Sequence, residues 1–279
     1  MPDLKESQLV RGPVVAGSFY PADAEDLKDE LRAFCERESP LRKYRAAVMP
    51  HAGYIYSGAV AGKTLSRVKL DDVATFLILG PNHTGLGAKF SVFPDGRWLT
   101  PLGEVGINSK FKDMILDASS DFEEDEKAHC REHSIEVEIP FIQFIKNKSP
   151  FDIVAISISH DSPQSYVRLG RALSEAISGY GKKVFIIASS DMTHYEPRSS
   201  ASEKDSAAIE KIIGLDVMGL AEVVTKKRIS MCGYGPVMTA MACCKRLGAE
   251  KAELVAYKTS GDVSGDHESV VGYAGVLIQ

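Results

Sequence analysis

Residues 184–195 read Val-Phe-Ile-Ile-Ala-Ser-Ser-Asp-Met-Thr-His-Tyr. The apolar first half of this stretch is typical of a parallel strand that is buried on both faces. Glu196-Pro197 then ends regular structure, so the carboxylate of Asp191 and the imidazole of His194 follow the carboxyl end of the strand. Because open α/β sheets bind ligands at that edge, we expect the functional site here.

Two earlier segments repeat this arrangement. Residues 45–49 predict a core strand followed by Pro50-His51, and residues 74–80 predict a second strand followed closely by His83. The glycine-rich segment after His51 predicts a helix, but it lacks the glycine placement of a phosphate-binding loop. Three strands that each end near an imidazole lead us to expect that these side chains share one site.

Strands and helices alternate along the whole chain. Further strands are expected at 152–159, 254–259 and 270–278, and helices at 24–36, 57–65, 111–118, 163–177, 203–213, 217–224 and 237–247. Neither a linker nor an internal repeat interrupts this alternation. We therefore predict a single α/β domain over residues 1–279, with a central, largely parallel sheet flanked by helices.

Two segments are less regular. Residues 90–107 predict three short strands in an antiparallel flap beside the turn that carries the second histidine. The segment from Ser134 onward predicts a helix that is bent or tightened at Pro140. Such a helix would place His133 and Glu136 on one face.

The composition excludes several classes of protein. The chain has 279 residues, a formal charge of −5 and 44% hydrophobic residues, so it has no basic footprint for nucleic acid. Its apolar runs are too short for a membrane span, and residues 1–6 do not resemble a signal peptide. Five cysteines without a CxxC pair predict reduced thiols and a cytoplasmic protein.

Several side chains in turns have the chemistry of metal ligands, because imidazole, thiolate and carboxylate are common donors. The candidates are His51, His83, Asp191, His194 and Cys232. Two histidines with one anionic ligand suit Fe(II) or catalytic zinc, and a thiolate as the third ligand favours zinc, copper or redox-active iron. The position of Cys232 before a predicted helix predicts a lowered thiol pKa. By contrast, His129, His160 and His267 are each more typical of hydrogen-bonding or surface groups.

Six ordered motifs together resemble the Memo family, named after a mediator of ErbB2-driven cell motility and including the B protein of the AmmeMemoRadiSam system. They are Pro-His-Ala-Gly-Tyr-Ile-Tyr-Ser-Gly (50–58), Gly-Pro-Asn-His (80–83), Glu-His-Ser-Ile-Glu-Val (132–137), Ser-Ser-Asp-Met-Thr-His-Tyr (189–195), Cys-Gly (232–233) and Thr-Ser-Gly-Asp-Val-Ser-Gly-Asp (259–266). The resemblance covers nearly the whole chain. It implies a fold like that of the class III extradiol dioxygenases.

The resemblance also implies roles for the candidate residues. Family members bind iron or copper through two histidines and a cysteine, which correspond to His51, His83 and Cys232. His194 matches the acid/base position of the dioxygenases, and Asp191 is expected to orient a neighbour or to ligate. The dioxygenases use glutamate where this chain has Cys232. Prokaryotic relatives are associated with radical-SAM and AMMECR-type proteins, which are the partners that the resemblance implies, and eukaryotic members resemble phosphotyrosine-peptide binders and redox proteins.

These observations lead to two main hypotheses and a lesser one. In the first, the protein is a metal-dependent oxidoreductase, dioxygenase-like, with Fe(II), or else copper or zinc, on His51, His83 and Cys232. His194 then moves a proton, since histidine is the residue type whose unperturbed pKa lies nearest neutrality. In the second, the same cleft is a non-catalytic module that binds a peptide or small anion. In the third, a zinc ion activates water for hydrolysis. Whether Asp191 or Cys232 completes the coordination is left open.

Overall fold

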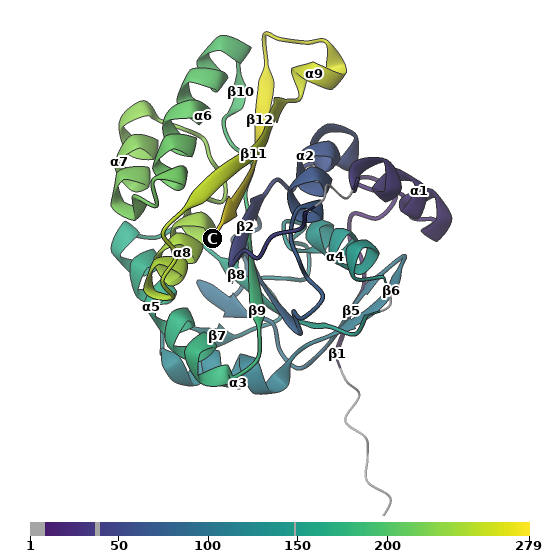
Figure 1. The fold of residues 1–279 in the computed structure, drawn as a ribbon, viewed down its shortest axis with the longest axis vertical. Coiled ribbons are helices and arrows are strands. Elements are labelled where there is room, and N and C mark those ends of the chain that lie inside the picture. The colour runs from purple at the N-terminus through teal and green to yellow at the C-terminus, as the bar shows by residue number, and fades with distance from the viewer. Residues whose placement is uncertain (1–8, 37–39, 148) are drawn as a thin grey trace, which may run out of the picture.

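The computed structural model of the chain describes residues 9–36, 40–147 and 149–279 (Figure 1). The strands are β1 (Leu9–Arg11), β2 (Ala46–Met49), β3 (Thr75–Pro81), β4 (Phe90–Val92), β5 (Gly96–Thr100), β6 (Gly103–Gly106), β7 (Glu123–Glu124), β8 (Asp152–Ile158), β9 (Val184–Ser189), β10 (His194–Glu196), β11 (Ala252–Thr259) and β12 (Val270–Ile278). The helices are α1 (Ala24–Phe34), α2 (Tyr54–Ser66), α3 (Ser109–Ala118), α4 (Ile139–Lys146), α5 (Pro163–Tyr180), α6 (Arg198–Ile213), α7 (Val217–Lys227), α8 (Tyr234–Arg246) and α9 (Gly261–Ser264), with one 3-10 turn, η1 (Glu136–Glu138). The prediction about residues 1–6 lies outside the described residues.

The centre of the main sheet is parallel. In the described residues its order is β10-β12-β2-β9-β3-β8-β4-β7, with β11 paired to β12. The four central strands β2, β9, β3 and β8 run parallel to one another. On one side of them, β12 pairs in antiparallel fashion with β2, β10 and β11. On the other side, β4 pairs in antiparallel fashion with β8. This confirms the predicted α/β class with a central sheet, and it adds antiparallel strands on both sides of the parallel core.

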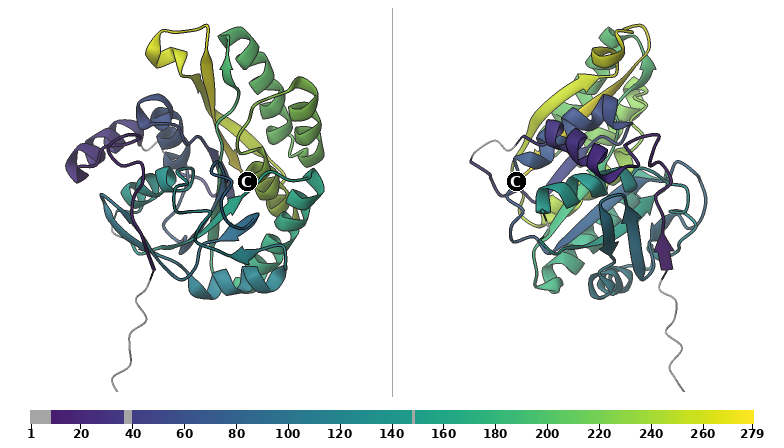
Figure 2. Two further views of the ribbon diagram at one scale, coloured as in Figure 1. Left: turned by 180° about the vertical axis from the view of Figure 1, so that it is seen from behind. Right: turned by 90° about the vertical axis from the view of Figure 1, so that its right-hand side faces the viewer.

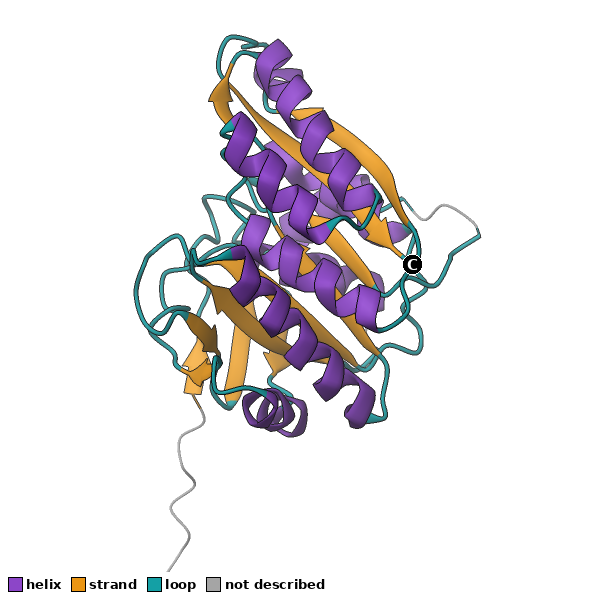
Figure 3. Cartoon of the chain, turned by 90° about the vertical axis from the view of Figure 1, so that its left-hand side faces the viewer, coloured by secondary structure: helices purple, strands orange, loops and turns teal. Residues whose placement is uncertain are grey.

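Each central strand contributes to two apolar layers because successive side chains point to opposite faces. In β9, Ile186 packs in the layer beneath α3, α5, α6, α7 and α8, while Phe185 and Ile187 pack in the layer beneath α1, α2 and α4. Figures 1 and 2 show the sheet between these two groups of helices, and Figure 3 shows the larger group face-on. Burial on both faces explains why these strands are continuous apolar runs.

The predicted flap at residues 90–107 is only partly correct. The β5–β6 hairpin is antiparallel, but it forms a separate three-stranded sheet with β1, which pairs with β5 in parallel. The first predicted strand, β4, is instead an antiparallel neighbour of β8 in the main sheet. Its apolar residues Phe90 and Val92 are buried in the larger core, which a flap outside the main sheet could not provide.

The helix expected from Ser134 begins later. Residues 136–138 form the 3-10 turn η1, and α4 starts at Ile139. Pro140 therefore lies in the first turn of α4, where its missing N–H breaks no hydrogen bond, and not inside a longer helix. The prediction that His133 and Glu136 share a helical face is wrong, because Glu136 bonds Arg11 and Tyr20 while His133 packs against other imidazoles.

Within the described residues, no helix combines the length and the apolar content that a membrane crossing requires.

Candidate metal centre

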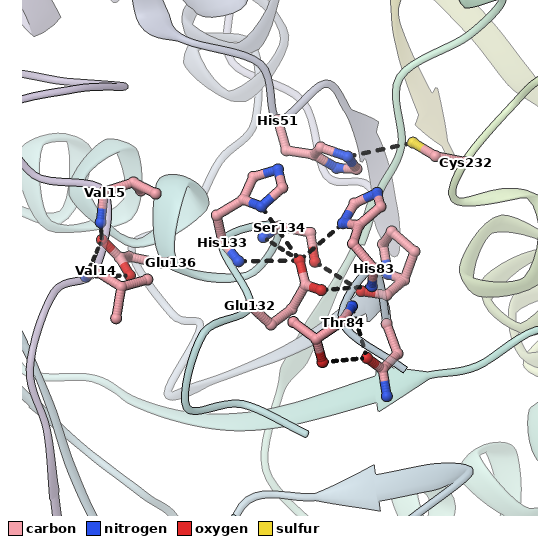
Figure 4. Close-up of polar contacts among 12 residues, drawn as sticks. Val14, Val15, His51, His83, Thr84, Glu132, His133, Ser134, Glu136 and Cys232 are labelled. Carbon is pink, nitrogen blue, oxygen red and sulfur yellow. Dashed lines mark hydrogen bonds and ion pairs between the residues drawn. The ribbon is translucent and has the colours of Figure 1, made fainter. Parts of the chain in front are cut away.

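Two strand ends and one helix start bring together two imidazoles and a thiol. His51 follows β2, His83 follows β3, and Cys232 lies just before α8. One ligand atom from each of these residues lies within 4.8 Å of the others. His51 Nε2 is 3.2 Å from Cys232 Sγ, as Figure 4 shows. The convergence expected at the carboxyl edge of the sheet is therefore present for these three side chains.

Ser189, the last residue of β9, fixes the ring of His51. Its Oγ lies 2.7 Å from His51 Nδ1, 2.7 Å from the carbonyl oxygen of Ser134 and 2.8 Å from Glu138 Oε1. A carbonyl only accepts, so the single hydroxyl proton of Ser189 is donated to Ser134. The other two neighbours must then donate to Ser189, which puts a proton on His51 Nδ1 and leaves the lone pair of the ring on Nε2.

Because Ser189 donates its only hydroxyl proton to Ser134, Glu138 must carry a proton to form a hydrogen bond with Ser189. This carboxyl group is fully buried, and its Oε2 has no hydrogen-bond partner among the described residues. Burial raises the pKa of Glu138 well above its ordinary value, and the nearby Asp191 carboxylate raises it further. Glu138 is thus a neutral donor that supports the His51 tautomer through Ser189.

Glu132 holds His83 in the same way, but as an anion. Glu132 Oε1 is 2.9 Å from His83 Nδ1, and Oε2 accepts from the His83 backbone N–H at 2.6 Å. The N–H groups of His133 and Ser134 also donate to Oε1. Although burial raises the pKa of Glu132, the bond from His83 and these N–H groups outweigh it and lower the pKa to about 2. His83 Nδ1 is therefore the donor, and Nε2 is left as the ligand atom.

A third imidazole, His133, packs against both ring systems and was not among the candidate ligands. Its ring stacks on His83 with centroids 4.9 Å apart, and it meets the edge of His51 at 5.5 Å. Burial lowers the pKa of His133, so the neutral ring is favoured. His83, Glu132 and His133 form a second group whose ligand atoms could hold a metal. No predicted strand ends at His133, so the pattern that selected the other histidines could not find it.

Asp191 and Cys232 occupy one corner of the site. Asp191 Oδ1 accepts the His51 backbone N–H at 2.9 Å, and the Asp191 N–H points to Cys232 Sγ at 3.3 Å. Burial raises the pKa of Asp191 to about 6. The prediction of a lowered thiol pKa is wrong, because burial and the Asp191 carboxylate raise the pKa of Cys232 more than backbone N–H groups lower it. Cys232, and not Asp191, belongs to the group with His51 and His83.

His194 lies close to this cluster but is not in ring contact with it. Its Nδ1 is 2.9 Å from the carbonyl oxygen of Ser230, and its backbone N–H donates to Ser230 Oγ at 2.7 Å. The charge of His194 still influences the pKa values of His51 and Asp191, so these groups lie within electrostatic range. Among the described aromatic rings, its partner is Tyr195. The imidazole that joins His51 and His83 is therefore His133.

The three histidines expected to act as ordinary groups lie outside both candidate ligand groups found among the described residues. His129 is buried with Nε2 3.1 Å from the carbonyl oxygen of Ser91, His160 Nδ1 is 2.9 Å from the hydroxyl of Tyr234, and His267 is exposed.

This geometry defines an α/β protein with a candidate metal centre of two imidazoles and one thiol at the carboxyl edge of parallel strands. A family model described as Memo-like protein matches residues 11–277. MEMO1 family proteins from Ignicoccus hospitalis and Methanopyrus kandleri are 44% and 39% identical, covering 96% and 97% of this chain and 98% and 99% of theirs. The chain therefore belongs to the Memo family.

A solved structure shares the fold at much lower sequence identity. The uncharacterized protein JW3007 from Escherichia coli K12 matches with a TM-score of 0.52 and 11% identity, covering 83% of this chain and 99% of that one. This similarity supports the overall arrangement of sheet and helices and says nothing about activity.

Proposed function

We propose that the chain binds one transition-metal ion, Fe(II) or copper, through His51, His83 and Cys232. The observation that carries the proposal is the clustering of three ligand atoms within 4.8 Å. Both Nδ1 atoms are already engaged, with Ser189 and with Glu132, so the Nε2 atoms remain to ligate. Metal-ligating histidines typically have their second nitrogen fixed in this way.

The donor set fits these metals. Burial and neighbouring imidazoles lower the pKa of His51 well below 6.5, so the ring is neutral and ready to ligate. The thiol of Cys232 has a raised pKa and would have to lose its proton when an ion binds. Two imidazoles and a thiolate suit copper, zinc and redox-active iron. When bound, Fe(II) or copper would supply Lewis acidity and one-electron chemistry, consistent with a dioxygenase-like or other redox activity.

His194 and Asp191 lie near the proposed ligands. The Ser230 carbonyl next to His194 Nδ1 favours a proton on that atom, which leaves Nε2 to accept or return a proton. Asp191 fixes the backbone of His51 and contacts Cys232 through its own N–H, so it orients two of the proposed ligands. We propose the proton transfer for His194 and the orienting role for Asp191.

Two measurements test this proposal. A Cys232 thiolate on Cu(II) or Fe(III) gives a visible charge-transfer absorption, which Cys232→Ser should abolish and Cys130→Ser, at an exposed cysteine, should retain. An unchanged absorption in Cys232→Ser would exclude the thiolate as a ligand. Oxygen consumption with catechols or thiols should then be lost in His194→Asn and kept in His267→Asn.

The alternative hypothesis, that this site is a non-catalytic binding module, makes the opposite prediction for turnover. If metal-loaded protein consumes no oxygen with any of these substrates yet retains its spectrum, the metal site stands and the catalytic role of His194 does not. Exposed Ile55, Tyr56 and Tyr195 would then be contacts for a peptide ligand, because they are large apolar side chains and adjoin the segments that carry His51 and His194.

A further inference from the structure

A cavity lies at the opposite end of the sheet from the candidate metal centre. The proposed metal ligands His51 and His83 follow the carboxyl ends of β2 and β3, whereas this cavity is lined by residues that precede β2, β3, β9 and β11. Its volume is about 690 Å³. Gln279, marked C in Figure 1, is part of its wall. The two sites therefore lie at opposite edges of the same parallel strands.

Positive charge dominates the wall of this cavity. The cationic side chains come from four separate segments and are Lys43, Arg45, Lys69, Lys182, Lys183 and Lys251. The acidic side chains in the wall are Asp72 and Glu250, and even with the carboxyl group of Gln279 counted, cations outnumber anions two to one. The chain as a whole carries a formal charge of −5, so this concentration runs against its overall charge.

Most of these cations are not neutralised by the protein. Lys183 forms an ion pair with Asp72. The side chains of the other five form neither an ion pair nor a hydrogen bond with any described residue. Unpaired cations that converge on a concave surface produce a focused positive potential.

A structural role at helix ends does not account for them. Lysines often compensate the negative carboxyl ends of helices, and α5 and α8 end near this edge of the sheet. Lysines of this chain that cap carbonyl groups do so directly, as Lys146 does with the carbonyls of Leu70 and Val73 and Lys245 does with that of Leu215. The five unpaired cations of the cavity form no such contact with the described residues.

We propose that this cavity binds a small, multiply charged anion of the phosphate-bearing class. Its volume is within the range of small-molecule sites, which are roughly 300–1,000 Å³. The side chains of Tyr44, Val73, Ile177 and Val184 add apolar and aromatic surface for an organic part of the ligand. Lysine and arginine are the side chains that recognise phosphate groups, and the acidic remainder of the chain disfavours a long nucleic acid.

The test is titration calorimetry of the metal-free full chain with sodium tripolyphosphate at 150 mM salt. Lys69→Gln/Lys182→Gln removes two charges from the cavity. Lys110→Gln/Lys226→Gln removes two exposed, unpaired charges outside it and is the matched control. All four are exposed positions, so both variants should fold, and thermal melting without ligand checks this.

We expect a saturable one-to-one interaction that the cavity variant weakens by about tenfold or more and the control leaves within about twofold. Equal weakening in both variants would show diffuse attraction to the surface and overturn the proposal, as would the absence of binding at millimolar tripolyphosphate. Because the titration uses metal-free protein, an absence of tripolyphosphate binding would leave the proposed metal centre untouched.

Discussion

Replacing Glu138 by glutamine should stabilise the metal-free protein at neutral pH. The hydrogen-bond count around Ser189 requires that Glu138 be protonated in the folded state, while in the unfolded chain its pKa returns to about 4.5. Folding at pH 7 therefore includes the uptake of a proton. Glutamine has nearly the same shape, keeps an N–H donor for Ser189 and needs no proton.

The sign and size of the expected stability change follow from the linkage between proton binding and folding. An acid whose folded pKa is raised binds more protons in the folded state, so stability falls as pH rises above the unfolded value. Each pH unit above the unfolded pKa lowers the free energy of unfolding by about 1.4 kcal/mol while the folded state keeps its proton. For Glu138 the interval from 4.5 to 7 gives a ceiling of about 3 kcal/mol if the proton is retained throughout. The gain in Glu138→Gln should thus be near zero at pH 4.5 and grow with pH.

Urea denaturation of metal-free wild type and Glu138→Gln between pH 5 and 8 measures this difference directly. Glu222→Gln, at an exposed position on α7, is the control and should follow the wild type. A Glu138→Gln variant that is less stable than wild type at pH 7, or whose stability difference does not change with pH, would refute the assigned protonation. The His51 tautomer derived from the same contacts would be refuted with it.

Three further perturbations have defined outcomes. Glu132→Gln removes the anion that orients His83 and should weaken metal affinity by about 10–100-fold in competition with a chelator, and unchanged affinity would contradict its role. Arg11→Met leaves the buried carboxylate of Glu136 unpaired and should cost about 3–5 kcal/mol in urea denaturation, whereas a loss below about 1 kcal/mol would mean that the pair is dispensable. Gly233→Ala places a Cβ 2.2 Å from a backbone carbonyl oxygen of β9, so the adjoining ligand loop must shift, and metal binding should fall even if the variant still melts cooperatively.

The strands of the parallel core could be predicted because their burial is visible in the sequence itself. Segments such as 184–189 are apolar without interruption, which is what burial between two helical layers demands. Parallel strands also align their carboxyl ends, so His51 and His83 could be expected at one edge before any contact was known. The placement of β4 could not be predicted, because three residues fit a hairpin or a sheet edge equally well.

The parts of the site that the sequence did not reveal depend on tertiary contacts. His133 reaches the cluster because the N–H groups of His133 and Ser134 donate to Glu132, and no helical or strand periodicity marks such a loop. The pKa of Cys232 was predicted from its place before a helix, but burial beside Asp191 outweighs that effect. Glu138 looked like one acidic residue in an ambiguous segment, and its role depends on a contact with the end of β9.

The most direct test of the proposed metal centre is the metal content of untagged protein purified without air, measured by mass spectrometry after reconstitution with Fe(II). We expect one ion per chain in the wild type. His51→Ala, His83→Ala and Cys232→Ser should each lose most of it, while Cys130→Ser and His267→Asn should keep it. Full occupancy in the first three variants would contradict the account.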